Sequence, residues 1–443
     1  MTTSLPLALL ALGALGAGLI AGLIARTAPR LGFLGWALVL FFVPVWVGVT
    51  VGPFWAAISL TTALLVATNW SAVPLSTADL FMAGFVILAG VGYSVGSVSL
   101  SALVIALTEW VMPYVWGRVA LARMSTDWVT VAIGSMAVLA AALVVLEFTV
   151  GTNPFVLIPG SGEAYTTWSP RQIRGGVIRA EGAFGHSIAL GGSMAISVAF
   201  VIGTRWPLVP KLLATGLVGL ATILTFSRAG IITFVFTLAL TTMFLPGLTR
   251  RFRAVIVATA IAIAGVVMTQ LGAVFDAADS DLEVSGGYRT DLLVLLERIR
   301  VIGNAGDWSS LVVGDNYLGY FARSVDNALL VFLLRFGWIP TVLLVMPIVC
   351  AVATTARRQT RSPAGLAVVG QLPSLVVVAL ITQYGMLLWF CVGLALTWAQ
   401  QLRTAESATL SVEASAAVQG TVLQPLGSRS EVGHWSSRKS PPG

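Results

Sequence analysis

Residues 128–150 read WVTVAIGSMAVLAAALVVLEFTV, a run with a single charged side chain, Glu147. Such a run is long enough to cross the roughly 30 Å hydrocarbon core of a bilayer as one helix. Similar runs recur along the 443 residues, which are 57% hydrophobic and only 10% charged. Soluble domains carry about a quarter charged residues, and disordered chains are poor in apolar ones. The sequence therefore predicts a multi-pass membrane protein and excludes an ordinary soluble enzyme.

Hydropathy predicts an all-α transmembrane bundle of about twelve or thirteen spans. The lower number applies if residues 31–70 hold one span and a re-entrant piece. No basic segment precedes residues 5–25, so we interpret them as a retained helix and not a cleaved signal. The candidate spans cover approximately residues 5–25, 31–50, 53–70, 79–96, 98–117, 128–150, 184–203, 207–225, 229–246, 254–275, 326–353, 364–382 and 384–400.

Two long segments between spans divide the chain into six regions. We expect N-terminal transmembrane helices (1–150), a first long extracytoplasmic loop (151–183), core transmembrane helices (184–275), a second long extracytoplasmic loop (276–325), C-terminal transmembrane helices (326–400) and a disordered cytoplasmic tail (401–443). The tail is rich in Ser, Ala and Gly, a composition typical of disorder.

The basic residues predict the orientation. A net charge of +7 suggests nucleic acid in a soluble protein, but here we attribute it to cytoplasmic loops and expect no nucleic-acid partner. Alternating the spans places 16 of the 25 basic residues on one side, mostly in short turns, which makes that side cytoplasmic and both long loops external. These residues are Arg26, Arg30, Arg118, Arg123, Arg205, Lys211, Arg250, Arg251, Arg253, Arg357, Arg358, Arg361, Arg403, Arg429, Arg438 and Lys439.

The remaining nine basic residues are all arginine. A guanidinium binds phosphate or carboxylate oxygens in a fork, so these arginines suggest an anionic ligand at the outer face. The alternative is a general preference for Arg over Lys, which the cytoplasmic loops also show. The nine are Arg171, Arg174, Arg179, Arg228, Arg289, Arg298, Arg300, Arg323 and Arg335.

Four segments carry candidate chemistry at the predicted outer face. They are RQIRGGVIRAEGAFGHSIALGG (171–192), LTFSRAG (224–230), GGYRTDLLVLLERIR (286–300) and SVDNALLVFLLRFGWIP (324–340). In the third, leucines at helical spacing predict a short amphipathic helix on the membrane surface.

In this order the four segments resemble the O-antigen ligase and polysaccharide polymerase family over about residues 170–345. That family shows an Arg followed by Gly-x-Phe-x-(His/Asn), a Ser-Arg hairpin, and a large outer loop that begins near an Arg and ends in a His-Asn or Asp-Asn pair. The resemblance implies a GT-C-like glycosyltransferase of the plasma membrane. It implies a polyprenyl-pyrophosphate-linked glycan as donor, a glycan or lipid glycan as acceptor, and polysaccharide-assembly proteins as candidate partners.

The resemblance also implies roles for individual residues. Asp326 matches the position of the base, which is usually His in the ligase branch, and Arg179 and Arg289 match pyrophosphate-binding positions. The further candidate substrate-binding residues are Arg228, His186, Arg323 and Asn327. The chemistry agrees, because a departing pyrophosphate gains negative charge and an acceptor hydroxyl needs a base. Polymerase and ligase share these motifs, and the Asp-Asn pair slightly favours a polymerase.

Each of these residues also has a structural interpretation. Asp326 is a good helix N-cap, with Asn327 completing the cap, and Arg323 is a candidate ion-pair partner for Asp326. His186 is equally suited to satisfying a polar group inside the bundle. Arg228 at a hairpin can simply extend to the interface.

Charges within predicted spans are expensive and usually functional. Glu109, Glu147 and Arg335 are such residues. At 100° per residue, Arg335 lies on the opposite helix face from Asp326, so we expect it to pair with a buried acid such as Glu109.

The sequence predicts no cofactor and no metal. It has no nucleotide-binding glycine loop, and Asp279-Ser-Asp281 is a short match to a metal motif that arises easily by chance.

Two other classes stay open. A transporter or flippase for lipid-linked oligosaccharide also needs cavity arginines and buried acids, although the sequence shows no internal repeat and no paired interrupted helices. A structural partner in a cell-envelope complex is the third class.

Overall fold

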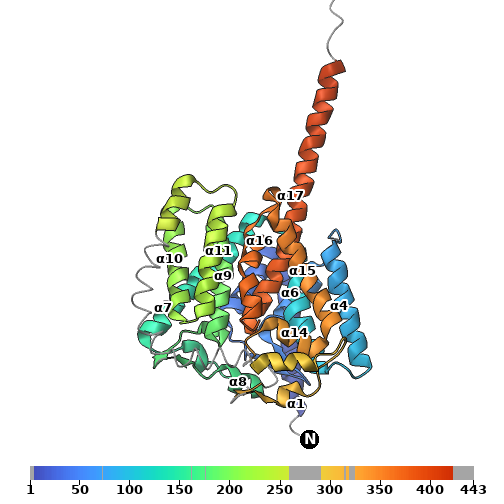
Figure 1. Cartoon of the computed structure of the whole chain (residues 1–443), viewed down its shortest axis with the longest axis vertical. Coiled ribbons are helices and arrows are strands. Elements are labelled where there is room, and N and C mark those ends of the chain that lie inside the picture. Colours follow the sequence, from blue (N-terminus) through green and yellow to red (C-terminus); the bar gives the residue numbers. More distant parts are fainter. Residues whose placement is uncertain are drawn as a thin grey trace, which may run out of the picture. The chain divides into compact units, whose positions relative to one another are not determined.

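The computed structural model describes residues 4–422 apart from 72, 161, 175, 259–290, 314–315 and 319–324. The chain divides into two units, residues 1–400 and 401–443. The first unit is a bundle of apolar helices (Figure 1). This protein is therefore a helical membrane protein.

Five described segments are long and apolar enough to cross a bilayer. One of them is continuous through a π-helical turn, η1 (Ala106–Val111), which joins α5 (Leu100–Ile105) to α6 (Met112–Ala120). The others are α4 (Thr77–Ser94), α7 (Thr126–Val150), α15 (Trp338–Ala356) and α17 (Thr382–Val422), whose apolar part ends at Ala408.

The other elements are shorter, apart from the N-terminal helix. The helices are α1 (Ser4–Thr27), α2 (Pro29–Phe42), α3 (Ala57–Asn69), α8 (Gly162–Trp168), α9 (Ser187–Gly203), α10 (Leu208–Leu224), α11 (Arg228–Phe244), α14 (Ala328–Phe336) and α16 (Pro363–Gly370). The 3₁₀ helices are η2 (Pro154–Leu157), η3 (Gly182–Phe184), η4 (Leu293–Arg298), η5 (Trp308–Ser310), η6 (Arg358–Thr360) and η7 (Leu372–Val376). Three antiparallel hairpins pair β1 (Gly48–Thr50) with β2 (Phe54–Ala56), β3 (Ile173–Arg174) with β4 (Val177–Ile178), and β5 (Val312–Val313) with β6 (Asn316–Tyr317).

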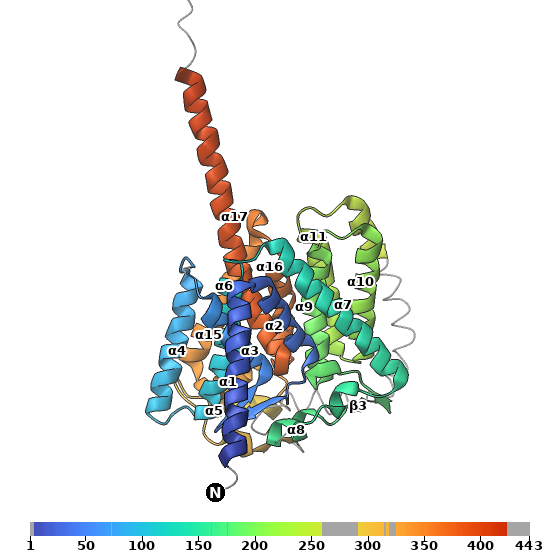
Figure 2. The ribbon, with the colours of Figure 1, turned by 180° about the vertical axis from the view of Figure 1, so that it is seen from behind.

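The connections alternate between the two ends of the bundle (Figures 1 and 2). We call the end with the described parts of 151–186 and 291–327 the loop end, and the end with turns 121–125, 204–207 and 357–362 the turn end. Basic side chains tie the turns together, as where Arg123 donates to the carbonyl of Arg26 and Arg205 pairs with Asp127 at 2.9 Å. The described basic turns thus share one end, as alternation of the spans predicts.

The core of the bundle surrounds α9, which is buried along nearly its whole length and packs against α7, α10, α11 and α16. Small residues allow this close packing. A Cβ at Gly191 would lie 3.2 Å from the Cα of Gly230 on α11, and one at Gly192 would lie 2.5 Å from the ring of Tyr384 on α17.

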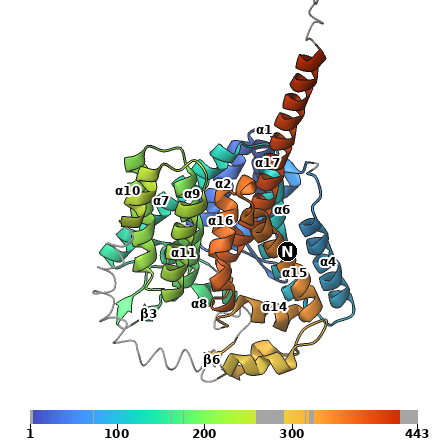
Figure 3. The same cartoon turned by 45° about the horizontal axis from the view of Figure 1, so that its top comes forward.

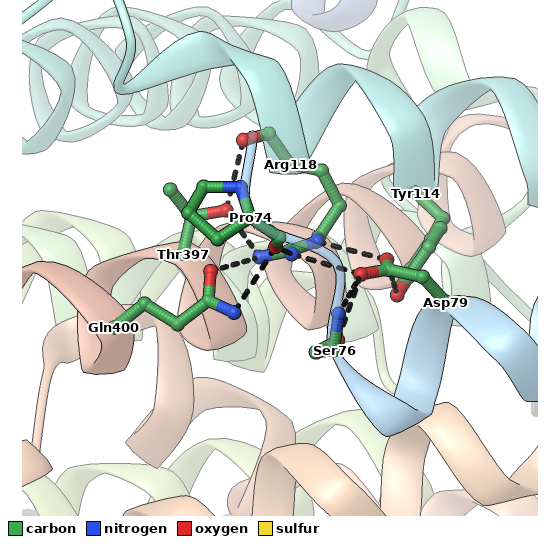
Figure 4. Close-up of polar contacts among 7 residues, drawn as sticks. All are labelled: Pro74, Ser76, Asp79, Tyr114, Arg118, Thr397 and Gln400. Atoms are coloured by element: carbon green, nitrogen blue, oxygen red, sulfur yellow. Dashed lines mark hydrogen bonds and ion pairs between the residues drawn. The ribbon is translucent and has the colours of Figure 1, made fainter. Parts of the chain in front are cut away.

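A buried ion pair joins three spans at the turn end (Figure 4). The guanidinium of Arg118 on α6, only 4% exposed, donates to both carboxylate oxygens of Asp79 on α4, each at 2.9 Å. It also donates to the Thr397 hydroxyl of α17 at 2.8 Å and to the carbonyl of Pro74. The side chain that we interpreted only as an orientation signal is therefore a cross-link between helices.

Two predicted spans are interrupted in the structure. Residues 326–353 form α14 and α15, separated by Gly337 at φ 84°, a conformation that favours glycine. Residues 364–382 form α16 and η7 and then an irregular stretch to Ile381, because Pro373 has no N–H to continue a helix. Hydropathy did not indicate either of these two breaks.

Two further differences concern the ends of the chain. Within 31–70, short helices α2 and α3 flank the β1–β2 hairpin, where the sequence left open either two full-length spans or one span with a re-entrant piece. Residues 401–422 are helical and not disordered, since Ala, Leu, Glu and Gln there are strong helix formers. Residues 423–443 lie outside the described residues.

The contact between α6 and α17 yields a stability prediction. A Cβ at Gly393 would lie 2.0 Å from the Tyr114 carbonyl, so Gly393→Ala must force the two backbones apart. We expect it to destabilise the detergent-solubilised protein by roughly 1–3 kcal/mol, the usual cost of overpacking, seen as a lower Tm. Gly216→Ala on α10 is the control, because its Cβ would meet nothing within 4 Å. Equal Tm values for the two variants would contradict this packing.

Candidate functional site

The first long loop is fixed to the bundle by Glu147, near the end of α7. Its carboxylate accepts the backbone N–H of Glu181 at 3.1 Å and that of Gly182 at 2.9 Å. Asn153 donates to the carbonyl of Gly182 at 3.0 Å. Glu147 therefore satisfies backbone groups of a buried irregular segment, which is a structural reason for a charge within a span.

The same loop joins the Ser-Arg hairpin between α10 and α11. Arg179 is buried, and its Nε donates to the Thr225 carbonyl at 2.8 Å. The next residue, Ala180, donates its N–H to the Leu224 carbonyl at 3.1 Å. Two of the four candidate segments are thus in direct contact.

Beside this contact, α9 and α11 both begin at the loop end. They run in the same direction, and Gly191 and Gly230 bring their first turns together. Arg228 is the first residue of α11 and is partly exposed. Helix N-termini carry partial positive charge, so two of them beside Arg179 and Arg228 create a surface suited to an anion. We call these two arginines and two helix starts the arginine corner.

His186 closes the N-terminus of α9. Its Nδ1 accepts the N–H of Ile188 at 3.2 Å, and its Nε2 lies 2.8 Å from the Nε2 of Gln172. Gln172 in turn accepts from the Ser187 hydroxyl at 2.6 Å. With both ring nitrogens engaged, this placement favours the structural interpretation of His186 over ligand contact.

Asp326 and Asn327 have separate roles at the start of α14. The side chain of Asn327 accepts the N–H of Leu330 at 3.0 Å, so Asn327 is the N-cap. Asp326 precedes the cap and is partly exposed. Of the two interpretations that the sequence left open for Asp326, base or cap, the N-cap contact of α14 is made by the neighbouring Asn327.

A cavity opens at the loop end between η1, α14 and the irregular residues 379–382. Glu109 and Arg335 both line it, and they attract each other electrostatically. The prediction that Arg335 and Asp326 lie on opposite faces of one helix assumed that both residues are helical. Asp326 precedes α14, which begins at Ala328, so that argument does not apply. Arg335 is buried and lies 5.9 Å from the ring of Trp308.

The described part of the second long loop lies beside α14 (Figure 3). Leu292 and Leu295 pack with Trp308 against Leu330 and Leu334 of α14. The predicted surface helix is therefore a 3₁₀ segment whose leucines are partly buried within the protein. The predicted residues Arg289 and Arg323, and the pair Asp279 and Asp281, lie outside the described residues.

The site contains residues that the motifs did not indicate. Gln172 links the loop to α9, and Thr382 lines the cavity at a left-handed φ of 51°. Neither residue is part of a recognisable sequence motif. For Thr382, the sequence QLPSLVVVALIT (371–382) does contain a sign, because Pro373 interrupts the helical pattern before it.

No protein-family model matches this chain, and no curated protein sequence matches it.

The Glu147 contacts predict a measurable change in the first loop. Gln at position 147 keeps one acceptor but turns an N–H₂ group toward a backbone N–H donor. We expect Glu147→Gln to accelerate hydrogen exchange at the amides of Glu181 and Gly182 by at least about tenfold. Glu163→Gln, an exposed acid of the same loop, is the control and should change neither amide. Unchanged exchange in the first variant would show that the loop does not depend on this carboxylate.

Proposed function

We propose that this protein is a membrane glycosyltransferase of the O-antigen ligase or polymerase type. It transfers a glycan from a polyprenyl-pyrophosphate carrier to a hydroxyl of another glycan or lipid glycan. The observation that carries the proposal is the arginine corner, where Arg179 and Arg228 from two separate candidate segments lie beside the starts of α9 and α11.

The electrostatics of the corner suit a pyrophosphate leaving group. Negative charge grows on the bridging oxygen as the glycosidic bond breaks, and fixed guanidinium groups and the positive ends of two helices stabilise it most at that stage. The predicted Arg289 would add to this set.

The orientation follows from the charge distribution. The described basic turns lie at the turn end, so the positive-inside rule places that end in the cytoplasm. The loop end, with the arginine corner and the cavity, then faces outward at the plasma membrane.

In the proposed reaction, the acceptor hydroxyl oxygen attacks the anomeric carbon of the donor sugar. The bond from that carbon to the pyrophosphate oxygen breaks, and the anomeric configuration inverts. Asp326 takes the hydroxyl proton, and polyprenyl pyrophosphate departs with the electron pair of the broken bond. Asp326 precedes α14, whose first residue, Ala328, lines the cavity, and this neighbourhood supports the proposed role.

Release of polyprenyl pyrophosphate from a native lipid-linked oligosaccharide tests this function. We expect release by the reconstituted wild type and a loss of about 100-fold or more in Asp326→Asn, since general bases contribute roughly 10²–10⁴-fold. Asp291→Asn, an exposed acid of the second loop, is the control and should retain the rate. No release by folded wild type, or full release by Asp326→Asn, would contradict the proposal.

A transporter or flippase of lipid-linked oligosaccharide is the second candidate. The two interrupted segments around Gly337 and Pro373 favour it, because transporters bind substrate beside broken helices. Sealed proteoliposomes distinguish the two functions. A transporter moves the intact donor between leaflets without releasing pyrophosphate, whereas the enzyme releases it.

A further inference from the structure

The cavity at the loop end has two neighbouring parts. The inner part, of about 50 Å³, and the outer part, of about 370 Å³, share Ile105 and Arg335 in their walls. The volume of the outer part is typical of a small-molecule site, whereas the inner part has room only for a small group. Neither part is lined by Arg179 or Arg228, so the cavity is separate from the arginine corner.

The outer part is lined with groups that bind hydroxyls. Ser99 and Ser101 come from the start of α5, and Asn304, Asp307 and Ser309 come from the second loop. These hydroxyl, amide and carboxylate groups provide both donors and acceptors within one wall.

Two lining residues have unsatisfied polar atoms. Thr382 Oγ1 and Asn304 Oδ1 are buried and have no hydrogen-bond partner among the described residues. Thr382 is only 6% exposed and holds a strained left-handed conformation. Strain and unpaired buried groups together are costly, and they persist where a ligand uses them.

The inner part combines aromatic walls with a charged group. Trp110, Trp168 and Phe332 line it beside Glu109. Glu109 lies in the π-helical turn η1, a distortion that occurs frequently at functional sites. The inner part has room for a hydroxyl group of a sugar held in the outer part, and the Glu109 carboxylate is an acceptor for it.

We propose that this cavity binds the terminal sugars of the acceptor glycan, with Glu109 accepting a hydrogen bond from a sugar hydroxyl and Thr382 and Asn304 contacting others. This assignment rests on the proposed function. It deepens that function by giving the acceptor a site of its own.

The position of the cavity agrees with an acceptor role. Trp168 lines the cavity, and its ring centre lies 6.2 Å from that of His186 at the start of α9. Gln383, next to Thr382, donates to the carbonyl of Ala183 at 3.2 Å. The cavity and the arginine corner therefore adjoin each other, as acceptor and donor sites must.

Two unpaired polar groups argue against a prenyl chain as the occupant. An apolar chain would leave the Thr382 hydroxyl and the Asn304 amide oxygen buried without hydrogen bonds, which is unfavourable. A hydroxylated ligand satisfies them.

Direct binding tests the assignment without requiring turnover. The probe is a labelled oligosaccharide released by mild acid from the surface polysaccharide of the producing cell. Equilibrium dialysis measures its Kd for the purified full-length protein. We expect saturable binding by the wild type, roughly 10- to 100-fold weaker binding by Glu109→Gln, and several-fold weaker binding by Thr382→Val.

Matched variants control for general damage. Thr242→Val removes another buried, unpartnered hydroxyl among the described residues, on α11, and Glu163→Gln neutralises an exposed acid. Both should bind as the wild type does. Absence of saturable binding by the wild type, or equal Kd values for all variants, would overturn the assignment. A loss of polyprenyl-phosphate binding in Glu109→Gln, with oligosaccharide binding intact, would assign the cavity to lipid instead.

The two proposals fail in different ways. If oligosaccharide binding depends on Glu109 but the wild type releases no pyrophosphate, the binding site stands and the proposed enzymatic function is contradicted. If the wild type and Glu109→Gln release pyrophosphate at the same rate and bind the oligosaccharide equally, only the acceptor site is contradicted.

Discussion

The carboxylate of Glu147 accepts two successive backbone N–H groups, those of Glu181 and Gly182, and the geometry of the loop end depends on this contact. Irregular backbone buried in a membrane bundle needs internal partners, because lipid supplies none. Once residues 181–182 are held, Arg179 reaches the Thr225 carbonyl and His186 reaches the start of α9. The arginine corner therefore follows from one acid placed near the end of α7.

The hydropathy and charge of the sequence predicted much of this fold. Long apolar runs such as 128–150 and 79–96 correspond to α7 and α4 within a few residues, because the need to satisfy backbone groups in lipid makes such runs helical. The alternation of spans also placed the described basic turns at one end. Within the site, two of the four segments that the sequence singled out, 171–192 and 224–230, are in direct contact.

The remaining features depend on contacts that no local pattern encodes. Arg118 has the same sequence context as any basic turn, and only Asp79 and Thr397, far away in the chain, make it a cross-link. The cap of α14 is on Asn327 and not Asp326, a difference of one residue that is decided by backbone geometry. The cavity forms where two apolar runs are interrupted, at Gly337 and after Pro373. Hydropathy averaged over a window of residues does not show such interruptions.

The central claim is that the starts of α9 and α11, with Arg179 and Arg228, hold the pyrophosphate of a lipid carrier. The most direct test is a cryo-electron microscopy map of the full-length protein in lipid nanodiscs with polyprenyl pyrophosphate added. The account predicts pyrophosphate density within hydrogen-bond distance of both guanidinium groups, beside the Thr225–Arg228 hairpin. Well-defined pyrophosphate density at the turn end, or at the loop end but away from these two arginines, would contradict it.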